Sequence, residues 1–221
     1  MTDNQLITPI SNQPKRVVFC DFDGTITVEE TFVAMLKHFA PDLSAQLIPE
    51  MYAKKLTLRA GVRQILESIP AECYPEIIKF SQDKLIRPGL VELLDFLDSQ
   101  GIPFVVVSGG IRVMVETVMG DLVNRVEAIY ALDLDASGSH LKVLSEFEGE
   151  TELVSKVRVM ELYDADVRVA IGDSVTDLNM AKAASIVFAR DRLVKYLDEE
   201  QKSYILWNDF FDVINNLTVN K

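Results

Sequence analysis

The sequence predicts an α/β fold in which a parallel sheet lies between two layers of helices and carries a small all-helical insertion. Three apolar runs rich in β-branched residues, at 17–20, 104–107 and 167–171, have the length and composition of strands buried on both faces. Each run is followed by a helix-like segment, and this alternation is typical of parallel strands joined by helices. The first two runs are also farther apart than a single strand–helix–strand unit requires.

The remaining elements follow from the same periodicities. Helical spacing or composition predicts helices at 89–100, 111–119, 174–184 and 190–199. A strand pair is expected at 126–134 and 140–146, with Ser137-Gly138-Ser139 as the hairpin tip. Residues 204–207 are expected to supply a last edge strand.

An insertion is predicted between the first two strands. Asp21 and Ser108 are 87 residues apart, whereas a βαβ unit takes roughly 30 residues. The intervening apolar residues form helical stripes, as within 32–39, and prolines stand near the expected helix ends. We therefore predict that residues 29–86 form a small helical cap, that 15–28 and 87–221 form the α/β core, and that 1–14 are a polar lead-in.

Composition excludes several classes of partner. The chain has 22 Lys and Arg against 34 Asp and Glu, a formal net charge of −12, and such a surface repels nucleic acid and anionic lipid. No apolar run has the length of a membrane helix or a signal peptide. Cys20 and Cys73 lack the spacing of metal ligands or of a disulfide framework. These features predict a cytoplasmic protein that binds neither nucleic acid nor membranes. A monomer or homodimer is expected, although no feature of the sequence determines the oligomeric state.

Two carboxylates follow the first predicted strand, in Asp21-Phe22-Asp23-Gly24-Thr25. An ionised aspartate is an oxygen nucleophile toward phosphorus, and a second carboxylate nearby can protonate the leaving oxygen and later accept a proton from water. Gly24 allows a sharp turn, which Thr25 can support through its hydroxyl. An isolated Asp-x-Asp is more often a turn than a catalyst, so the interpretation depends on the other strand ends.

The third predicted strand ends in Gly172-Asp173, and Asp177 follows one helical turn later. Magnesium prefers oxygen ligands, usually one or two carboxylates together with water and phosphate. Asp173 is therefore a candidate magnesium ligand, and Asp177 can hold a metal-bound water or another side chain. The alternative is that Asp173 and Ser174 only cap the following helix.

The second predicted strand ends in Ser108-Gly109-Gly110, where a hydroxyl and exposed amides can hold phosphate oxygens. A simple glycine turn is the alternative. Lys156 begins the helix-like run before the third strand, so that its ammonium can balance phosphoryl charge; Lys142 and Arg158 are competitors for this role. Since ligands bind beyond the carboxyl ends of parallel strands, all these residues are expected at one edge of the sheet.

The four segments, in this order, resemble the motifs of the haloacid dehalogenase (HAD) superfamily of phosphatases. The resemblance spans residues 17 to about 190, with the insertion where the C1 caps of that superfamily lie. It implies a HAD-like Rossmannoid three-layer core, with Asp21 as the nucleophile that becomes an aspartyl phosphate and Asp23 as general acid and base. It further implies Mg²⁺ held by Asp21, Asp173 and the Asp23 backbone carbonyl, and phosphoryl oxygens held by Ser108 and Lys156.

Within the superfamily the chain resembles the phosphoserine-phosphatase-like branch. The stretch 171–184 and the segment Phe188-Ala189-Arg190-Asp191 are most similar to the enol-phosphate phosphatases of methionine salvage. Glu30 matches a cap-proximal Glu of phosphoserine phosphatases, whereas the Arg that binds the serine carboxylate there has Ala60 near its place, with Arg59 and Arg63 as offset candidates. The resemblance thus implies a small phosphate ester as substrate, with Glu30, Arg59 and Arg63 as candidate contacts from the cap.

Three alternatives stay open at this point. A phosphoserine phosphatase or a phosphomutase of the same superfamily would use the same groups. A signalling receiver domain also uses strand-end acids, a Ser or Thr and a Lys, but such domains are about half this length and carry adjacent acids.

Overall fold

The computed structural model describes residues 15–219, which form a seven-stranded sheet in the order β4-β3-β2-β1-β5-β6-β7. All pairings are parallel except that of β3 with β4, which is antiparallel. The strands are β1 (Arg16–Cys20), β2 (Phe104–Ile111), β3 (Ala128–Asp135), β4 (Lys142–Leu144), β5 (Val167–Gly172), β6 (Ile186–Ala189) and β7 (Ile205–Leu206). This confirms the predicted α/β class, while the predicted lead-in at 1–14 lies outside the described residues.

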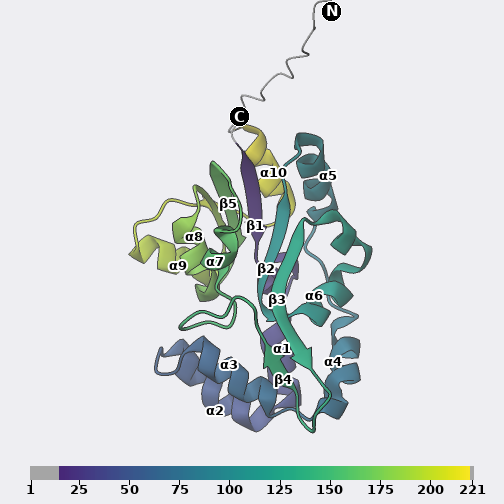
Figure 1. Cartoon of the computed structure of the whole chain (residues 1–221). Helices are drawn as coiled ribbons and strands as arrows, with labels where there is room; N and C mark the ends of the chain where they lie inside the picture. Colours follow the sequence, from purple (N-terminus) through teal and green to yellow (C-terminus); the bar gives the residue numbers. More distant parts are fainter. Residues whose placement is uncertain (1–14, 220–221) are drawn as a thin grey trace, which may run out of the picture.

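The central strand β1 shows why the sheet is buried on both faces. Val17 and Phe19 belong to one hydrophobic cluster, and Val18 and Cys20 belong to the other. Because successive side chains of a strand point to opposite faces, an uninterrupted apolar run supplies both clusters at once. Figure 1 shows the two layers: α7, α8 and α9 on one side of the sheet, and α5 and α10 on the other.

The core helices are α5 (Leu90–Gln100), α6 (Arg112–Met119), α7 (Lys156–Met160), α8 (Leu178–Ala183), α9 (Asp191–Glu199) and α10 (Phe210–Val219). Short helical turns occur at η1 (Phe22–Ile26), η2 (Ala71–Cys73), η3 (Gly120–Arg125) and η4 (Val175–Asp177). In the described part of the chain, no helix has both the length and the apolar character needed to cross a bilayer.

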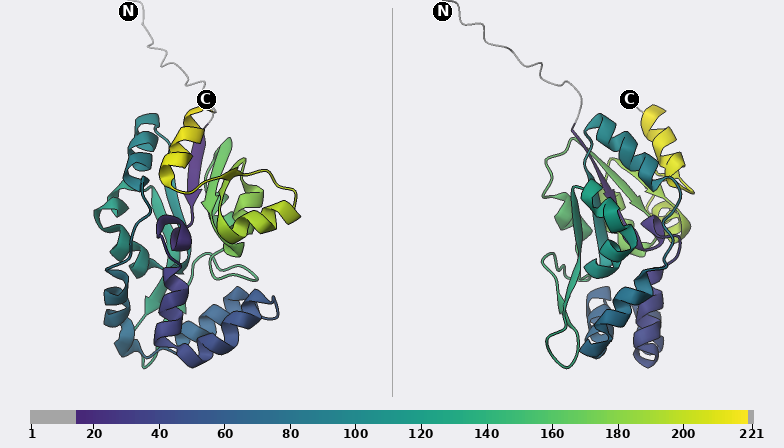
Figure 2. Two further views of the ribbon diagram at one scale, coloured as in Figure 1. Left: turned by 180° about the vertical axis from the view of Figure 1, so that it is seen from behind. Right: turned by 90° about the vertical axis from the view of Figure 1, so that its right-hand side faces the viewer.

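Four further helices lie between β1 and β2 in the sequence, and we call them the inserted helices. They are α1 (Thr31–Phe39), α2 (Pro41–Tyr52), α3 (Leu58–Glu67) and α4 (Tyr74–Ser81). Two views show them gathered at one end of the sheet (Figure 2). The β3–β4 hairpin reaches this end as well, since Leu141 N donates to the Ile69 carbonyl at 2.9 Å and Ala71 N to the Ser139 carbonyl at 3.1 Å.

The chain leaves and re-enters the core through two adjacent segments, which Arg87 holds together. Its buried guanidinium donates to the carbonyl oxygens of Gly24 (2.7 Å), Thr25 (2.9 Å) and Thr27 (3.2 Å) on the outgoing segment. The guanidinium also lies 5.3 Å from the centre of the Trp207 ring. Arg87 therefore fixes the turn that follows Asp21 from the side of the returning segment.

Replacing this guanidinium tests its structural importance. Arg87→Met is expected to lower the free energy of unfolding by about 2–4 kcal/mol, because several buried carbonyl groups lose their donor at once. Urea denaturation of wild type and variant measures the change. Arg125→Met is the matched control, since Arg125 pairs with Asp98 at an exposed site, and should move the midpoint far less. Equal midpoints for wild type and Arg87→Met would contradict this assignment.

Candidate active site

Three adjacent strands deliver the predicted site residues to one sheet edge. Asp21 follows β1 and Asp173 follows β5, and the Asp21 amide donates to the Ile171 carbonyl at 2.9 Å. Ser108 lies within β2 rather than after it, because the pairing with β3 shifts register between Val107 and Ile111 and the strand continues to Ile111. Ser108 Oγ is buried and accepts a hydrogen bond from Gly110 N at 3.0 Å.

Lys156 forms buried salt bridges with two acids of the site, Asp21 and Asp177. It is the first residue of α7 and is 1% exposed, and its Nζ donates to Asp21 Oδ1 and, at 2.6 Å, to Asp177 Oδ1. Burial would lower the pKa of the ammonium, but the carboxylates of Asp177 and Asp21 outweigh it and raise the pKa. Lys156 therefore stays charged beside the proposed nucleophile. Lys142 and Arg158 are both exposed, and Arg158 donates to the Glu148 carbonyl.

Asp177 is fully engaged in holding the loop after β5. Its Oδ2 accepts from the backbone amides of Asp173 and Ser174, both at 3.0 Å, while Oδ1 accepts from Lys156. A Cβ at Gly172 would lie 2.6 Å from the Asp177 carboxyl carbon, so only glycine leaves room for this packing. Asp177 thus orients Asp173 and Lys156 through its own hydrogen bonds.

Asp23 links the turn after β1 to the first inserted helix. Its Oδ1 accepts from Phe32 N at 2.8 Å and from the Thr31 hydroxyl, at the start of α1. Burial raises the pKa of the Asp23 carboxyl, and these hydrogen bonds partly oppose that rise. A raised pKa suits a carboxyl group that must carry a proton to a leaving oxygen.

The turn between Asp21 and Asp23 is shaped around Asp173. Gly24 has φ +84°, and a Cβ there would lie 2.5 Å from Asp173 Oδ2. The neighbouring Thr25 hydroxyl donates to Asp173 Oδ1 at 3.2 Å. A glycine with positive φ therefore allows the backbone after Asp21 to approach Asp173, at the end of β5, closely.

The site carries more negative than positive charge. Oxygens of Asp21, Asp173 and Asp177 lie within 4.8 Å of one another, Asp23 is close by, and among the described residues Lys156 is the cation that bonds to this cluster. Burial, followed by the charge of the other acids, raises the pKa of both Asp21 and Asp173. The carboxylates of Asp21 and Asp173, which follow the adjacent strands β1 and β5, are oxygen donors that fit a divalent cation here, while both Asp177 oxygens hold Lys156 and the loop after β5.

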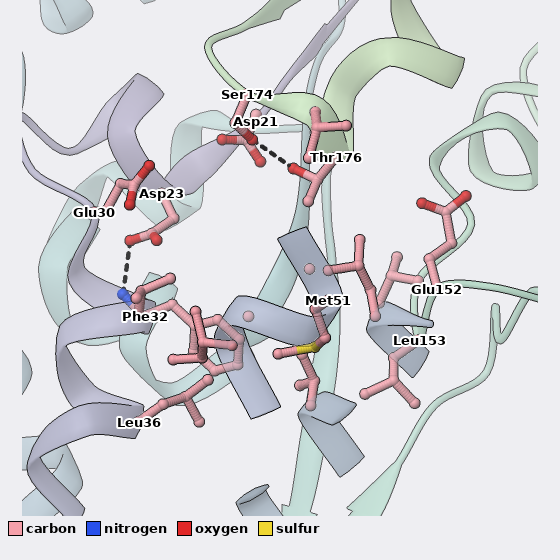
Figure 3. Close-up of a pocket in the computed structure, with 18 of the residues that line it drawn as sticks. Asp21, Asp23, Glu30, Phe32, Leu36, Met51, Glu152, Leu153, Ser174 and Thr176 are labelled. Carbon is pink, nitrogen blue, oxygen red and sulfur yellow. Dashed lines mark hydrogen bonds between the residues drawn. The ribbon is translucent and has the colours of Figure 1, made fainter. Parts of the chain in front are cut away.

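A mostly apolar pocket opens beside these acids, between the core and the inserted helices. Figure 3 shows Asp21, Asp23 and Glu30 at one end and Phe32, Leu36, Met51 and Leu153 toward the other. The inserted helices also contribute Val33, Ile48, Tyr52, Leu58 and Val62 to its wall. Gly109, Gly110 and Lys156 line the polar end. The pocket can therefore take an ester with a phosphate at one end and an apolar group at the other.

Two predicted substrate contacts lie elsewhere. Arg59 and Arg63 are absent from the pocket wall and both pair with Glu148, through Arg59 Nε at 2.6 Å and Arg63 Nη2 at 2.7 Å. They attach α3 to the loop after β4. Glu30 does line the pocket, but the arginine that meets it is Arg192 from α9, which the sequence did not single out. Nor did the sequence indicate the contribution of Met51 or Glu152 to the wall.

The fold and this arrangement of acids define a class of hydrolase. Residues 18–182 match the family model for haloacid dehalogenase-like hydrolases, and the chain belongs to that family. It is therefore an enzyme of the phosphatase type, as its relatives are named phosphatases.

The curated relatives give a more particular comparison. The chain is 55% identical over 200 residues to the 2-hydroxy-3-keto-5-methylthiopentenyl-1-phosphate phosphatase of Microcystis aeruginosa, covering 90% of this chain and 95% of that one. It is 31% identical over 208 residues to the phosphatase of the same name from Bacillus cytotoxicus, covering 90% and 94%.

Solved structures support the fold. A phospho-aspartyl intermediate analogue of phosphoserine phosphatase superposes with a TM-score of 0.69 at 20% identity, covering 92% of this chain and 99% of that one. Phosphoserine phosphatase from T. onnurineus gives 0.70 at 16% identity, covering 94% and 97%.

Proposed function

We propose that this enzyme is a magnesium-dependent phosphomonoesterase that hydrolyses 2-hydroxy-3-keto-5-methylthiopentenyl 1-phosphate in methionine salvage. The observation that carries the proposal is the position of Asp21: hydrogen-bonded to a buried Lys156, at the end of β1, and at the polar end of an otherwise apolar pocket. The names of the relatives at 55% and 31% identity support this choice of substrate.

Asp21 would attack the phosphorus atom and form an aspartyl phosphate while the bond from phosphorus to the ester oxygen breaks. Asp23 would give its proton to that departing oxygen. Water would then attack the aspartyl phosphate and pass a proton to Asp23, so that inorganic phosphate leaves and both acids return to their first state. Lys156, the Ser108 hydroxyl and the Gly109 amide would hold the phosphoryl oxygens.

Mg²⁺ would be held by the carboxylates of Asp21 and Asp173 and by the backbone carbonyl of Asp23. When bound, it supplies the positive charge that the cluster of acids lacks and offsets the charge of the phosphate. Asp177 and Thr25 would support it indirectly, since both bond to the Asp173 residue.

Residues 29–86, which contain the inserted helices, would form a cap over the active site, and the apolar wall of the pocket would receive the methylthio end of the substrate. A thioether is uncharged and polarisable, and it packs well against Phe32, Leu36 and Met51. Phosphoserine would place an ammonium and a carboxylate near the same wall without filling its apolar part. The enzyme would act in the cytoplasm on this small ester as a monomer or homodimer, without nucleic acid or membranes as partners.

A substrate panel tests the proposal. With Mg²⁺ present, kcat/KM for the methylthio enol phosphate is expected to exceed that for phosphoserine by about 100-fold or more, because the apolar tail fills the pocket. A hexose phosphate with product analysis separates hydrolysis from mutase activity. A kcat/KM for phosphoserine equal to or above that for the methylthio enol phosphate would contradict the proposed substrate. Isomerisation of the hexose phosphate would favour a mutase.

A further inference from the structure

A salt bridge joins the core to the inserted helices across the pocket. Arg192 Nη2, on α9 of the core, donates to Glu30 Oε1, which lies immediately before α1. The Arg192 guanidinium also lies 5.2 Å from the centre of the Tyr52 ring, at the end of α2. All three residues line the pocket, so this bridge is part of its wall rather than a distant surface pair.

Backbone hydrogen bonds next to Arg192 hold the start of α9 against the site. The amide of the next residue, Leu193, donates to the Asp173 carbonyl at 2.8 Å. Asp191 has φ +47°, a left-handed conformation that is uncommon among non-glycine residues and that Asp adopts more readily than most. On the other side, Arg190 donates to the Asn208 carbonyl at 2.8 Å. The backbone around Arg192 is therefore built onto the proposed metal-binding strand end.

Most other polar groups of the pocket are already engaged. Lys156 bonds to Asp21 and Asp177, Asp23 bonds to the start of α1, and the hydroxyls of Ser174 and Thr176 bond to each other at 2.8 Å. Glu30 and Arg192 stand side by side as an acceptor and a donor, 37% and 47% exposed. A carboxylate accepts several hydrogen bonds and a guanidinium donates five, so each can bind a ligand while keeping the other.

We propose that Glu30 and Arg192 form the specificity-determining contact for the oxygen-bearing middle of the substrate. Glu30 accepts a hydrogen bond from the hydroxyl on the second carbon, and Arg192 donates to the keto oxygen on the third. The phosphate lies at Asp21 and Lys156, and the tail lies against the apolar wall. This assignment rests on the proposed function, because it takes the hydroxyl and keto groups from the proposed substrate.

A matched pair of esters tests the assignment. One is the methylthio enol phosphate, and the other is 5-methylthiopent-1-enyl phosphate, which keeps the enol ester, the phosphate and the tail but lacks the hydroxyl on the second carbon and the keto oxygen on the third. Wild type is expected to prefer the first by about 30-fold or more in kcat/KM. Arg192→Met and Glu30→Gln should each reduce this preference about tenfold, mainly through KM, and the double variant should lose little more. Lys195→Met, an exposed charge on the same helix, is the control and should retain the full preference.

Each outcome distinguishes the two proposals. Variants that slow both esters equally would overturn the assignment, because the salt bridge would then only hold the inserted helices in place. A preference that survives in the variants, or that is missing in a wild type active on both esters, would also overturn it. A wild type that hydrolyses neither ester would overturn the proposed function and this assignment together.

Discussion

Asp21→Asn is expected to reduce phosphate release by about 10⁴-fold or more while leaving the protein folded. An amide has nearly the shape of a carboxylate but is not an oxygen nucleophile, so the covalent step is lost. The buried Lys156 keeps its 2.6 Å hydrogen bond to Asp177, and the packing around position 21 is preserved. Steady-state kinetics with the methylthio enol phosphate, or with p-nitrophenyl phosphate, measures the loss of activity, and circular dichroism checks the fold.

A second readout separates covalent catalysis from simple disruption of the site. Brief incubation with ³²P-labelled ester followed by an acid quench should label wild type and leave Asp21→Asn unlabelled, since the label is carried on the Asp21 carboxylate. Asp121→Asn, at an exposed position, is the control and should match wild type in both rate and labelling. Robust turnover by Asp21→Asn would remove Asp21 from its proposed role.

The acids of the site could be predicted because local sequence determines where they lie. Asp21 and Asp173 stand directly after short apolar runs, and parallel strands bring their carboxyl ends together whatever the detail of the helices. The place of Lys156, in contrast, depends on where a short helix begins, which no strand end determines. In the structure it is the first residue of α7, which puts its ammonium between Asp21 and Asp177.

The arginines were harder to place because their partners are distant in sequence. Arg192 and Glu30 are 162 residues apart, and nothing near either residue indicates the other. Arg59 and Arg63, which the resemblance offers as substrate contacts, do not line the pocket, and helical geometry explains why. Leu58 and Val62 face the pocket, and the residue after each is turned by about 100° around the helix, toward Glu148 instead.

The cluster of acids predicts a trade-off at Asp173 between the stability of the metal-free protein and its activity. Without metal, burial and the charges of Asp21 and Asp177 raise the pKa of the Asp173 carboxyl above its ordinary value of 3.8. The folded state then binds more protons than the unfolded state between that value and the raised pKa, so the free energy of unfolding falls as pH rises through this window. At neutral pH the metal-free protein is therefore destabilised by the group that its chemistry needs.

Asp173→Asn is accordingly expected to make the metal-free protein more stable at pH 7, by about 1–2 kcal/mol, and to abolish activity. Urea denaturation in EDTA measures the first effect. Adding Mg²⁺ at about 100 times its Kd should stabilise wild type by about 2.7 kcal/mol and Asp173→Asn far less, because the variant lacks a charged ligand. Asp83→Asn, at an exposed position, should respond to Mg²⁺ as wild type does. An Asp173→Asn protein that is less stable than wild type in EDTA would mean that the acids around Asp21 do not repel one another as inferred. Equal stabilisation of the variant and wild type by Mg²⁺ would mean that the metal binds elsewhere.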